Sequence, residues 1–204
     1  MKITNLKKTV GTFHLHIEDL TLEPKKIHGI SGHNGAGKSV LLKCIMGTAT
    51  PDEGTIDYEG LDSKEITLMS QRPYLLHGTV YENIVYPLKL RGLKPNEKEI
   101  DSLLEKVGLF AQKKQYARSL SSGERQKLSF LRAIVFKPKF IMMDETLSNL
   151  DPESEQLIMD MILEIQKEEP VTWLIVSHQL EQKQNFCDVI HRMEKGRYCG
   201  IIKG

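Results

Sequence analysis

A glycine-rich segment followed by a lysine and a serine is the first feature of this sequence that could do chemistry. The run Gly32-His33-Asn34-Gly35-Ala36-Gly37-Lys38-Ser39 matches the spacing G-x-x-x-x-G-K-[ST]. A polyphosphate needs a ring of backbone N–H donors, and glycine lets the backbone approach closely and take unusual dihedral angles. A helix that begins at such a loop points its positive end at the anion. The spacing therefore predicts a nucleotide-phosphate loop, with Lys38 at the β- and γ-phosphates and the Ser39 hydroxyl on Mg²⁺.

Two acids at the end of an apolar run are the second candidate. The four apolar residues 140–143 lead directly into Asp144 and Glu145. A buried strand that ends in aspartate suits a contact with phosphate-bound Mg²⁺ through water. A carboxylate beside the γ-phosphate, here Glu145, is able to polarise an attacking water as a general base. Alone, such a strand end is as often simply solvated, and it is the phosphate loop that favours the catalytic interpretation.

Strands and helices must position these residues, and the apolar pattern predicts both. Short apolar runs alternate with longer amphipathic stretches, which is typical of an α/β fold with a mostly parallel sheet. Strands are expected over 13–17, 26–31, 54–58, 66–70, 140–143, 172–176 and 189–193, and helices over 38–46, 97–107, 123–136 and 153–167. Asp151 is an expected N-cap, because Pro152 follows it at the first helical position.

The stretch from about 77 to 120 differs from the rest because it is basic and helical. Between residues 89 and 118, eight Lys and Arg stand against four Asp and Glu. We expect an inserted helical subdomain over about 77–136. The sequence has no internal repeat and no Pro-, Gly- or Ser-rich linker, so residues 1–204 are predicted to form a single domain.

Composition narrows the function classes. The 28 Lys and Arg nearly balance the 27 Asp and Glu, so no nucleic-acid partner is expected. Cys44, Cys187 and Cys199 are widely spaced and offer neither a disulfide framework nor paired metal ligands. Five histidines without metal-ligand spacing are expected to be strand or surface residues: His14, His16, His28, His77 and His191. No signal-peptide core or membrane-spanning run is present, so a cytoplasmic protein is expected.

Further motifs turn the two candidate sites into a family pattern. The segment Leu120-Ser121-Ser122-Gly123-Glu124-Arg125-Gln126 is similar to the L-S-G-G-Q signature of the ATP-binding cassette (ABC) ATPases. Gln71 resembles the Q-loop glutamine, residues 148–151 resemble the D-loop, and His178 resembles the switch histidine. The resemblance runs from about Ile3 to Ile202, with the motifs in family order. It implies a P-loop NTPase fold of the ABC type, with a central mostly parallel sheet, an N-terminal antiparallel β region and a helical lobe inserted in a RecA-like core.

The resemblance also implies a role for each matching residue. ATP would contact two sets: Gly32, Asn34, Gly35, Ala36, Gly37, Lys38, Ser39 and Val40 of the loop, and Ser121, Ser122, Gly123 and Asp151 of a second subunit. Catalysis would use Glu145 as the base, with His178 and Gln71. Mg²⁺ would be held by Ser39, Gln71 and Asp144. Because the signature caps ATP bound to the opposite subunit, a dimer around two ATP molecules is implied.

Two departures from the family pattern bear on nucleotide binding. Ser122 stands where the family has its first signature glycine, and its side chain either crowds the γ-phosphate or adds a hydrogen bond. Val10 stands where an adenine-stacking tyrosine is usual, and Phe13 is the nearest aromatic residue. For Phe13 we favour a strand-core role over stacking.

The resemblance implies the ATP-hydrolysing subunit of a transporter, on the cytoplasmic face of the membrane. Separate integral membrane permease chains, a second ABC subunit and a solute-binding protein would complete the system. Residues 77–92 resemble the lobe entry of importer-type ATPases, especially those for small oxyanions such as tungstate or phosphate. Two alternatives stay open: a soluble ABC ATPase that clamps nucleic acid or ribosomes, and a nucleotide-binding module without catalysis.

Overall fold

The computed structural model describes residues 1–147, 150–177, 180 and 186–202. Its strands are β1 (Lys2–Val10), β2 (Phe13–Thr21), β3 (Ile27–Ser31), β4 (Glu53–Asp57), β5 (Ile66–Met69), β6 (Phe140–Asp144), β7 (Thr172–Val176), β8 (Val189–Glu194) and β9 (Arg197–Ile202). Its helices of more than one turn are α1 (Lys38–Ile45), α2 (Val80–Leu90), α3 (Glu97–Lys106), α4 (Ser122–Ile134) and α5 (Pro152–Glu168). Within these residues, no helix is both long and apolar enough to cross a membrane.

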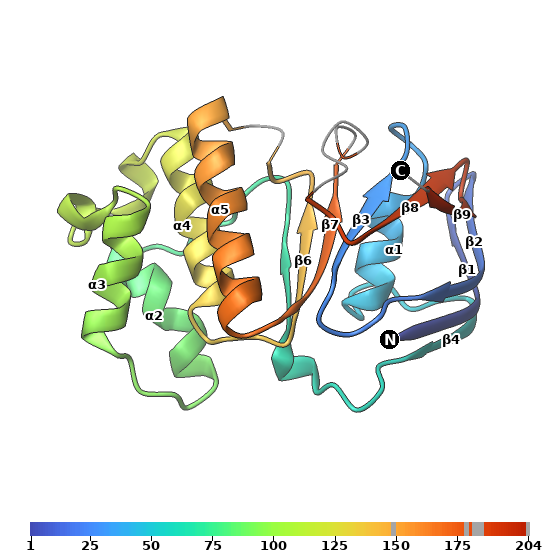
Figure 1. Ribbon diagram of the computed structural model, residues 1–204, viewed down its shortest axis with the longest axis horizontal. Coiled ribbons are helices and arrows are strands. Elements are labelled where there is room, and N and C mark those ends of the chain that lie inside the picture. Colours follow the sequence, from blue (N-terminus) through green and yellow to red (C-terminus); the bar gives the residue numbers. More distant parts are fainter. Residues whose placement is uncertain (148–149, 178–179, 181–185, 203–204) are drawn as a thin grey trace.

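The described strands form one sheet in the order β4-β1-β2-β9-β8-β3-β7-β6-β5 (Figure 1). Strands β8, β3, β7, β6 and β5 run parallel to one another. Strand β1 pairs antiparallel with β2 and β4, and β9 pairs antiparallel with β8. The expected parallel centre and N-terminal antiparallel region are thus confirmed. The two parts join where His16 of β2 pairs with Arg197 of β9, so that they form a continuous sheet.

The centre of the sheet is covered on both faces, as its uninterrupted apolar strands predict. All residues of β3 and β7 are buried. Along β6 the side chains alternate between two apolar clusters: Phe140 and Met142 pack with α1, whereas Ile141 and Met143 pack with α4 and α5. In Figure 1, α1 accordingly lies on the opposite face of the sheet from α4 and α5.

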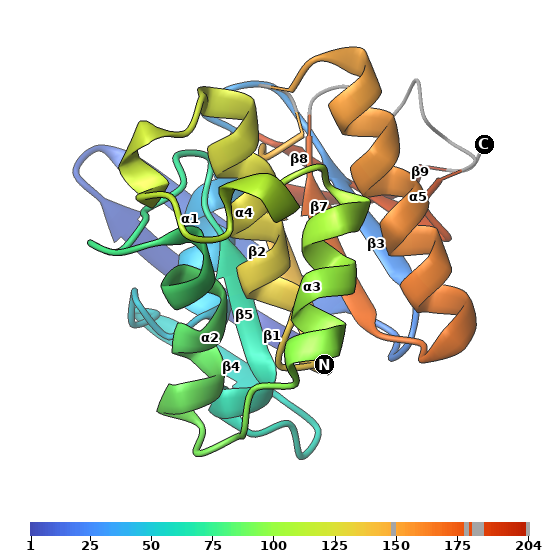
Figure 2. The same ribbon diagram turned by 90° about the vertical axis from the view of Figure 1, so that its left-hand side faces the viewer.

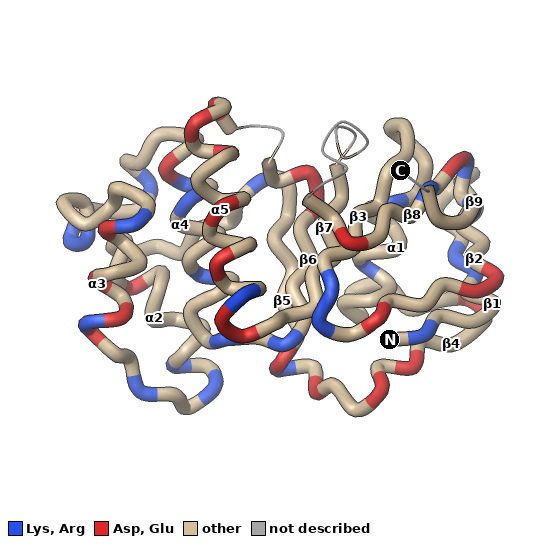
Figure 3. Tube along the Cα trace, viewed as in Figure 1, with Lys and Arg blue, Asp and Glu red and all other residues tan. Residues whose placement is uncertain are grey.

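Helices α2, α3 and α4 gather at one end of the molecule, beside the edge strand β5 (Figure 2). Their apolar side chains join the cluster that also contains those of α5, including Ile84, Leu104, Leu128 and Ile158. Figure 3 shows lysines and arginines spread along the outer segments of this end. The division of the chain into a core and a helical subdomain at 77–136 stays a prediction.

Candidate functional site

The phosphate loop connects β3 to α1, at the edge of the sheet where the parallel strands end. Gly32, Gly35 and Gly37 have φ angles of 154°, 80° and 100°. A Cβ atom on Gly32 would lie 2.3 Å from the backbone oxygen of Met193, and one on Gly37 would lie 2.8 Å from the ring of Phe13. Gly32 and Gly37 therefore have no room for a side chain. All three positions also have backbone dihedral angles that favour glycine.

The Lys38 ammonium lies inside this loop. Its side chain is 5% exposed, and Nζ donates hydrogen bonds to the backbone oxygens of Gly32 at 2.7 Å and His33 at 3.1 Å. The same nitrogen is 3.6 Å from Oε1 of Glu145. A buried cation held by carbonyls and by one carboxylate at longer range is placed to bind an anion that enters the loop.

Ser39 and Asp144 bring two oxygen ligands together beside Lys38. The Ser39 hydroxyl donates a 3.0 Å hydrogen bond to Oδ1 of Asp144, which ends β6. Burial raises the pKa of Asp144, the hydrogen bond from Ser39 lowers it, and the nearby charge of Glu145 raises it again. Hydroxyl and carboxylate oxygens are the ligands that Mg²⁺ prefers, and a bound cation would offset the cost of burying this carboxylate. The residues present therefore fit Mg²⁺.

Glu145 lies at the turn that follows β6, in a left-handed conformation with φ of 50°. Its backbone N–H donates to the oxygen of Val176 at 2.9 Å, which fixes the turn against β7. Gln71 Nε2 donates to Oε2 of Glu145 at 3.3 Å. A non-glycine residue held in this region is strained, and such strain is concentrated at functional sites. The predicted base thus lies between the Q-loop glutamine and the phosphate-loop lysine.

These residues line one open pocket of about 520 Å³. The pocket contains Asn34, Gly35, Ala36, Gly37, Lys38, Ser39, Val40, Gln71 and Glu145, which the sequence assigns to the site, together with Val10 and Phe13. Phe13 was expected in the strand core, and it does pack against the apolar cluster that contains the side chains of α1. Its ring also lies directly over Gly37 of the phosphate loop. Val10 is 51% exposed at the rim. The β1–β2 hairpin places Val10 opposite Phe13, and Gly196 ties β2 to the loop by accepting from His16 N–H and donating to the backbone oxygen of Ala36. The phosphate motif gives no signal for Val10 and Phe13, to which only the family resemblance points.

The signature residues begin α4. Ser121 is its N-cap: the Ser121 hydroxyl accepts from the backbone N–H of Glu124, and the Glu124 carboxylate accepts from that of Ser121. Ser122 is the exposed first residue of the helix. A Cβ on Gly123 would lie 3.9 Å from Oδ2 of Asp151, which caps α5 as expected by accepting from Ser154 N–H at 2.9 Å.

The structure therefore brings the signature and Asp151 together, but not to the nucleotide pocket. Among the described residues that line that pocket, none belongs to 121–123. The Gln126 amide does connect the two regions, because it donates a buried 2.9 Å hydrogen bond to the backbone oxygen of Thr146, next to Glu145. His178 and residues 148–149 lie outside the described residues, so the role of His178 stays a prediction.

A glycine cradle closed by a lysine, a serine–aspartate pair and a strained glutamate, at the carboxyl edge of a parallel sheet, define a P-loop nucleotide-binding site. Residues 15–148 match the family model described as ABC transporter. The chain belongs to this family, as one of its ATP-binding, ATP-hydrolysing subunits.

Curated relatives and solved structures agree with this assignment. The chain is 38% identical over 202 residues to the tungstate uptake system ATP-binding protein TupC of Peptoclostridium acidaminophilum, which covers 96% of this chain and 94% of the relative. It is 34% identical over 192 residues to the methionine import ATP-binding protein MetN 1 of Listeria monocytogenes, and the match covers 87% of this chain and 57% of the relative. The solved cbiO1, part of the ABC transporter complex cbiONQ of Clostridium perfringens, superposes with a TM-score of 0.80 at 26% identity over 98% of this chain and 86% of that one.

Proposed function

We propose that this chain forms a head-to-tail dimer around two Mg-ATP molecules and drives a separate membrane permease that imports a small oxyanion. The observation that carries the proposal is the division of the site within one chain. Lys38, Ser39 and Glu145 line the nucleotide pocket, whereas Ser122 and Gly123 present the exposed start of α4 elsewhere. A second copy would supply these N–H groups and the positive helix end to the γ-phosphate.

In the proposed dimer, the chain that holds the phosphates also supplies the general base. Lys38 Nζ exchanges its carbonyl partners for phosphate oxygens, since both lie in the same loop. Glu145 accepts a proton from a water that Gln71 helps to position, while that water's oxygen bonds to the γ-phosphorus and the bond to the β-phosphate oxygen breaks. Mg²⁺, held through Ser39 and Asp144, would neutralise charge on the phosphate oxygens.

A groove beside the Q-loop is the proposed permease contact. It has a volume of about 260 Å³ and is lined by the end of β5, α2 and α4. Figure 2 shows these three elements at the end of the molecule that faces the viewer. Tyr74 is 77% exposed and Leu90 is 65% exposed at this groove, and Tyr86 also lines it. Large exposed apolar side chains around a groove are typical of a protein-binding surface. We expect a short helix from a permease loop to bind there, and this contact would hold the chain at the cytoplasmic face of the membrane.

The groove is also connected to the nucleotide site. Arg132 of α4 lines it, and its guanidinium donates to the backbone oxygen of Tyr74 at 2.6 Å. Tyr74 follows Gln71 by three residues, and Gln71 donates to Glu145. A helix that pressed on this segment would therefore displace the residue that contacts the catalytic base. This arrangement supports the coupling of hydrolysis to a partner in the membrane.

The oxyanion is the narrowest part of the proposal. It rests on the 38% identity to TupC, which is named for tungstate uptake, across nearly the full length of both chains. Methionine is the competing substrate, since relatives named for methionine import are 33 to 36% identical. The chain spans 57% of the length of the Listeria monocytogenes methionine relative, whereas it spans 94% of the tungstate relative.

The decisive experiment is affinity purification of the tagged chain from detergent-solubilised native membranes, with mass spectrometry of the proteins that copurify. We expect an integral membrane permease, and a solute-binding protein from the same system whose affinity for tungstate, molybdate and methionine can then be measured. Leu90→Glu should abolish the copurification while the ATPase rate of the isolated chain stays unchanged. The control Leu163→Glu changes another exposed leucine, on α5 and outside the groove, and should still recover the permease. Recovery from the soluble fraction with ribosomal proteins or nucleic acid would instead support the soluble clamp.

A further inference from the structure

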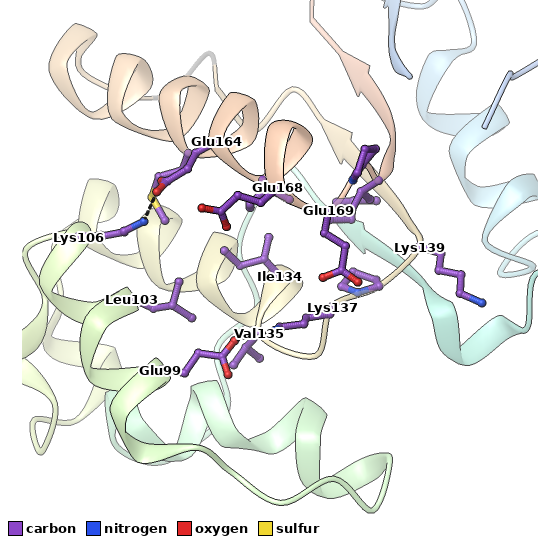
Figure 4. Close-up of a pocket in the computed structure, with 16 residues that line it drawn as sticks. Glu99, Leu103, Lys106, Ile134, Val135, Lys137, Lys139, Glu164, Glu168 and Glu169 are labelled. Atoms are coloured by element: carbon purple, nitrogen blue, oxygen red, sulfur yellow. Dashed lines mark hydrogen bonds and ion pairs between the residues drawn. The ribbon is translucent and has the colours of Figure 1, made fainter. Parts of the chain in front are cut away.

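A partly open hollow lies at the opposite edge of the sheet from the nucleotide, between α3, α5 and the turn that joins α4 to β6 (Figure 4). Its volume is about 230 Å³. The walls are apolar and come from all three elements: Leu103, Ile134, Val135, Pro138, Ile141, Met161, Ile165, Pro170 and Val171. Ile134, Val135 and Met161 are almost fully buried, so that the wall is part of the packed interior rather than a loose surface patch.

The charged side chains around the mouth divide into paired and unpaired groups. Lys106 is 2.6 Å from Glu164, Lys137 is 3.3 Å from Glu99, and Lys139 is 2.6 Å from Glu65. Each lysine at the mouth is therefore already neutralised by a carboxylate.

Glu168 and Glu169 are different, because neither carboxylate has an ion-pair or hydrogen-bond partner among the described residues. Figure 4 shows both carboxylates extending from the end of α5 toward the hollow, whereas Lys139 points away from it. The mouth thus keeps two uncompensated negative charges directly above an apolar wall.

The position of these carboxylates strengthens the negative potential. Glu168 is the last residue of α5 and Glu169 is its C-cap, where the helix presents unpaired carbonyl oxygens and the negative end of its dipole. Glu164 lies one turn before Glu168, a spacing at which like charges repel. Lysine or arginine at these positions would stabilise the helix, so the two carboxylates are electrostatically unfavourable for α5. A bound cation would remove that conflict.

We propose that this hollow is a binding site for a small amphipathic organic cation, with its ammonium group at Glu168 and Glu169 and its apolar body against Ile134 and Leu103. The apolar wall selects against simple metal ions, and the unpaired carboxylates select against neutral and anionic molecules. Such a ligand would touch α3 and α5 at once. It would therefore stiffen the contact between these helices that the Lys106–Glu164 ion pair makes at present.

Three probes that share one apolar body test this proposal on the full chain. They are 2-phenylethylammonium, the neutral 2-phenylethanol and the anionic phenylacetate. Isoleucine methyl groups serve as NMR reporters: Ile134, Ile141 and Ile165 line the hollow, whereas Ile17 and Ile56 lie among the strands β1, β2 and β4 at the other end of the sheet. We expect saturable shifts of the first three with the ammonium probe, and binding at least threefold weaker for the alcohol and weaker still for the acid.

Charge-removing variants distinguish specific recognition of the ammonium group from nonspecific hydrophobic binding. Glu168→Gln and Glu169→Gln should each weaken 2-phenylethylammonium about two- to fivefold, which is the upper part of the range for a solvent-accessible ion pair, and raising the salt to 0.5 M should weaken it further. Glu18→Gln, an exposed carboxylate on β2 with no ion-pair partner in the described part of the chain, is the matched control and should leave the affinity unchanged. All three glutamates are exposed, so none of the changes threatens folding.

Any of four results would overturn the proposal. They are shifts that do not saturate, shifts of Ile17 and Ile56 alone, equal binding of the alcohol and the ammonium probe, and an unchanged affinity in both Glu168→Gln and Glu169→Gln.

Discussion

The Ser39 hydroxyl donates a 3.0 Å hydrogen bond to Oδ1 of Asp144, which joins the first turn of α1 to the end of β6 across 105 residues of sequence. The two residues belong to motifs that are each short and local. Their contact arises because β6 and β3 flank β7 in one parallel sheet, so that both strands end at the same edge. The pair is the natural position for a divalent cation on the nucleotide phosphates.

The first prediction concerns this pair. Ser39→Ala should raise the Mg²⁺ concentration needed for half-maximal hydrolysis at least tenfold, because one oxygen ligand is lost while Asp144 remains. Removal of Mg²⁺ with EDTA should abolish hydrolysis in both proteins. The measurement is the ATPase rate against free Mg²⁺. Ser102→Ala, on the exposed face of α3, is the control and should behave as wild type. An unchanged Mg²⁺ dependence in Ser39→Ala would remove the hydroxyl from the metal site.

Glu145 supplies the second prediction. Glu145→Gln keeps the shape of the side chain and removes the proton acceptor, so hydrolysis should fall about 10²–10⁴-fold, the range for loss of a general base. ATP binding should persist, since Lys38 and the loop glycines are unchanged. We therefore expect the variant to accumulate as an ATP-bound dimer, which light scattering with and without Mg-ATP measures. A variant that hydrolyses ATP at the wild-type rate would show that another group is the base.

Phe13 carries the third prediction, on the nucleobase. Its ring lines the pocket beside Gly37, and Val10 stands at the rim. Aromatic stacking on a base contributes about 1–3 kcal/mol, so Phe13→Ala should weaken ATP at least fivefold. Val10→Ala should change the affinity little. The measurement is the dissociation constant for ATP and for GTP, together with the melting temperature. A lower melting temperature with an unchanged affinity would return Phe13 to the purely structural role that its strand pattern favours.

Much of this site is predictable from sequence because its parts are local. Two motifs are each contained in a few consecutive residues: the glycines around Lys38, and the two acids that follow an apolar run. The structure brings these two motifs together. Phe13 could not be assigned this way. Its place in the pocket depends on the β1–β2 hairpin and on a glycine in the middle of another motif, and neither is visible in a window around residue 13.

The fold shows the same distinction between local and distant causes. Buried strands with continuous apolar runs are predicted closely, and β7 has the expected bounds 172–176. Strand β1 is not predicted, since its register against β4 shifts between Thr4 and Lys7, where Asn5 has a φ of 48° and interrupts the alternation. Helix α2 is not predicted from the sequence because it contains Pro87, a residue that normally ends a helix, although the capping box of Thr79 and Glu82 marks its start.

Two of the histidines expected as strand or surface residues do lie in strands, where they form a buried pair. His28 of β3 and His191 of β8 lie side by side, with 3.0 Å between Nδ1 of His28 and Nε2 of His191. His28 Nε2 donates to the backbone oxygen of Glu23 at 2.9 Å, and the Tyr198 hydroxyl lies 3.2 Å from Nδ1 of His191. Each ring nitrogen has one partner, and the two rings cannot both be protonated without two N–H groups facing each other between Nδ1 of His28 and Nε2 of His191.

This pair gives the fourth prediction, on stability against pH. Burial first, and then the charge of His28, lower the pKa of His191 to about 4, and burial lowers the pKa of His28 despite the opposing effects of Glu23 and Asp188. Below pH 6.5 the unfolded chain binds a proton at each site that the folded chain resists, so the free energy of unfolding should fall as the pH decreases toward 4.

The expected loss from His191 is about 2 kcal/mol by pH 5, because the unfolded chain titrates near pH 6.5 and each pH unit below that corresponds to about 1.4 kcal/mol. Urea unfolding at pH 7.5, 6.0 and 5.0 measures it. His191→Gln should unfold more easily than wild type at pH 7.5 and show a shallower decline toward pH 5, whereas His14→Gln, on the exposed part of β2, should follow the wild-type curve. Equal slopes for wild type and His191→Gln would show that the buried pair does not control acid unfolding, and that carboxylates elsewhere do.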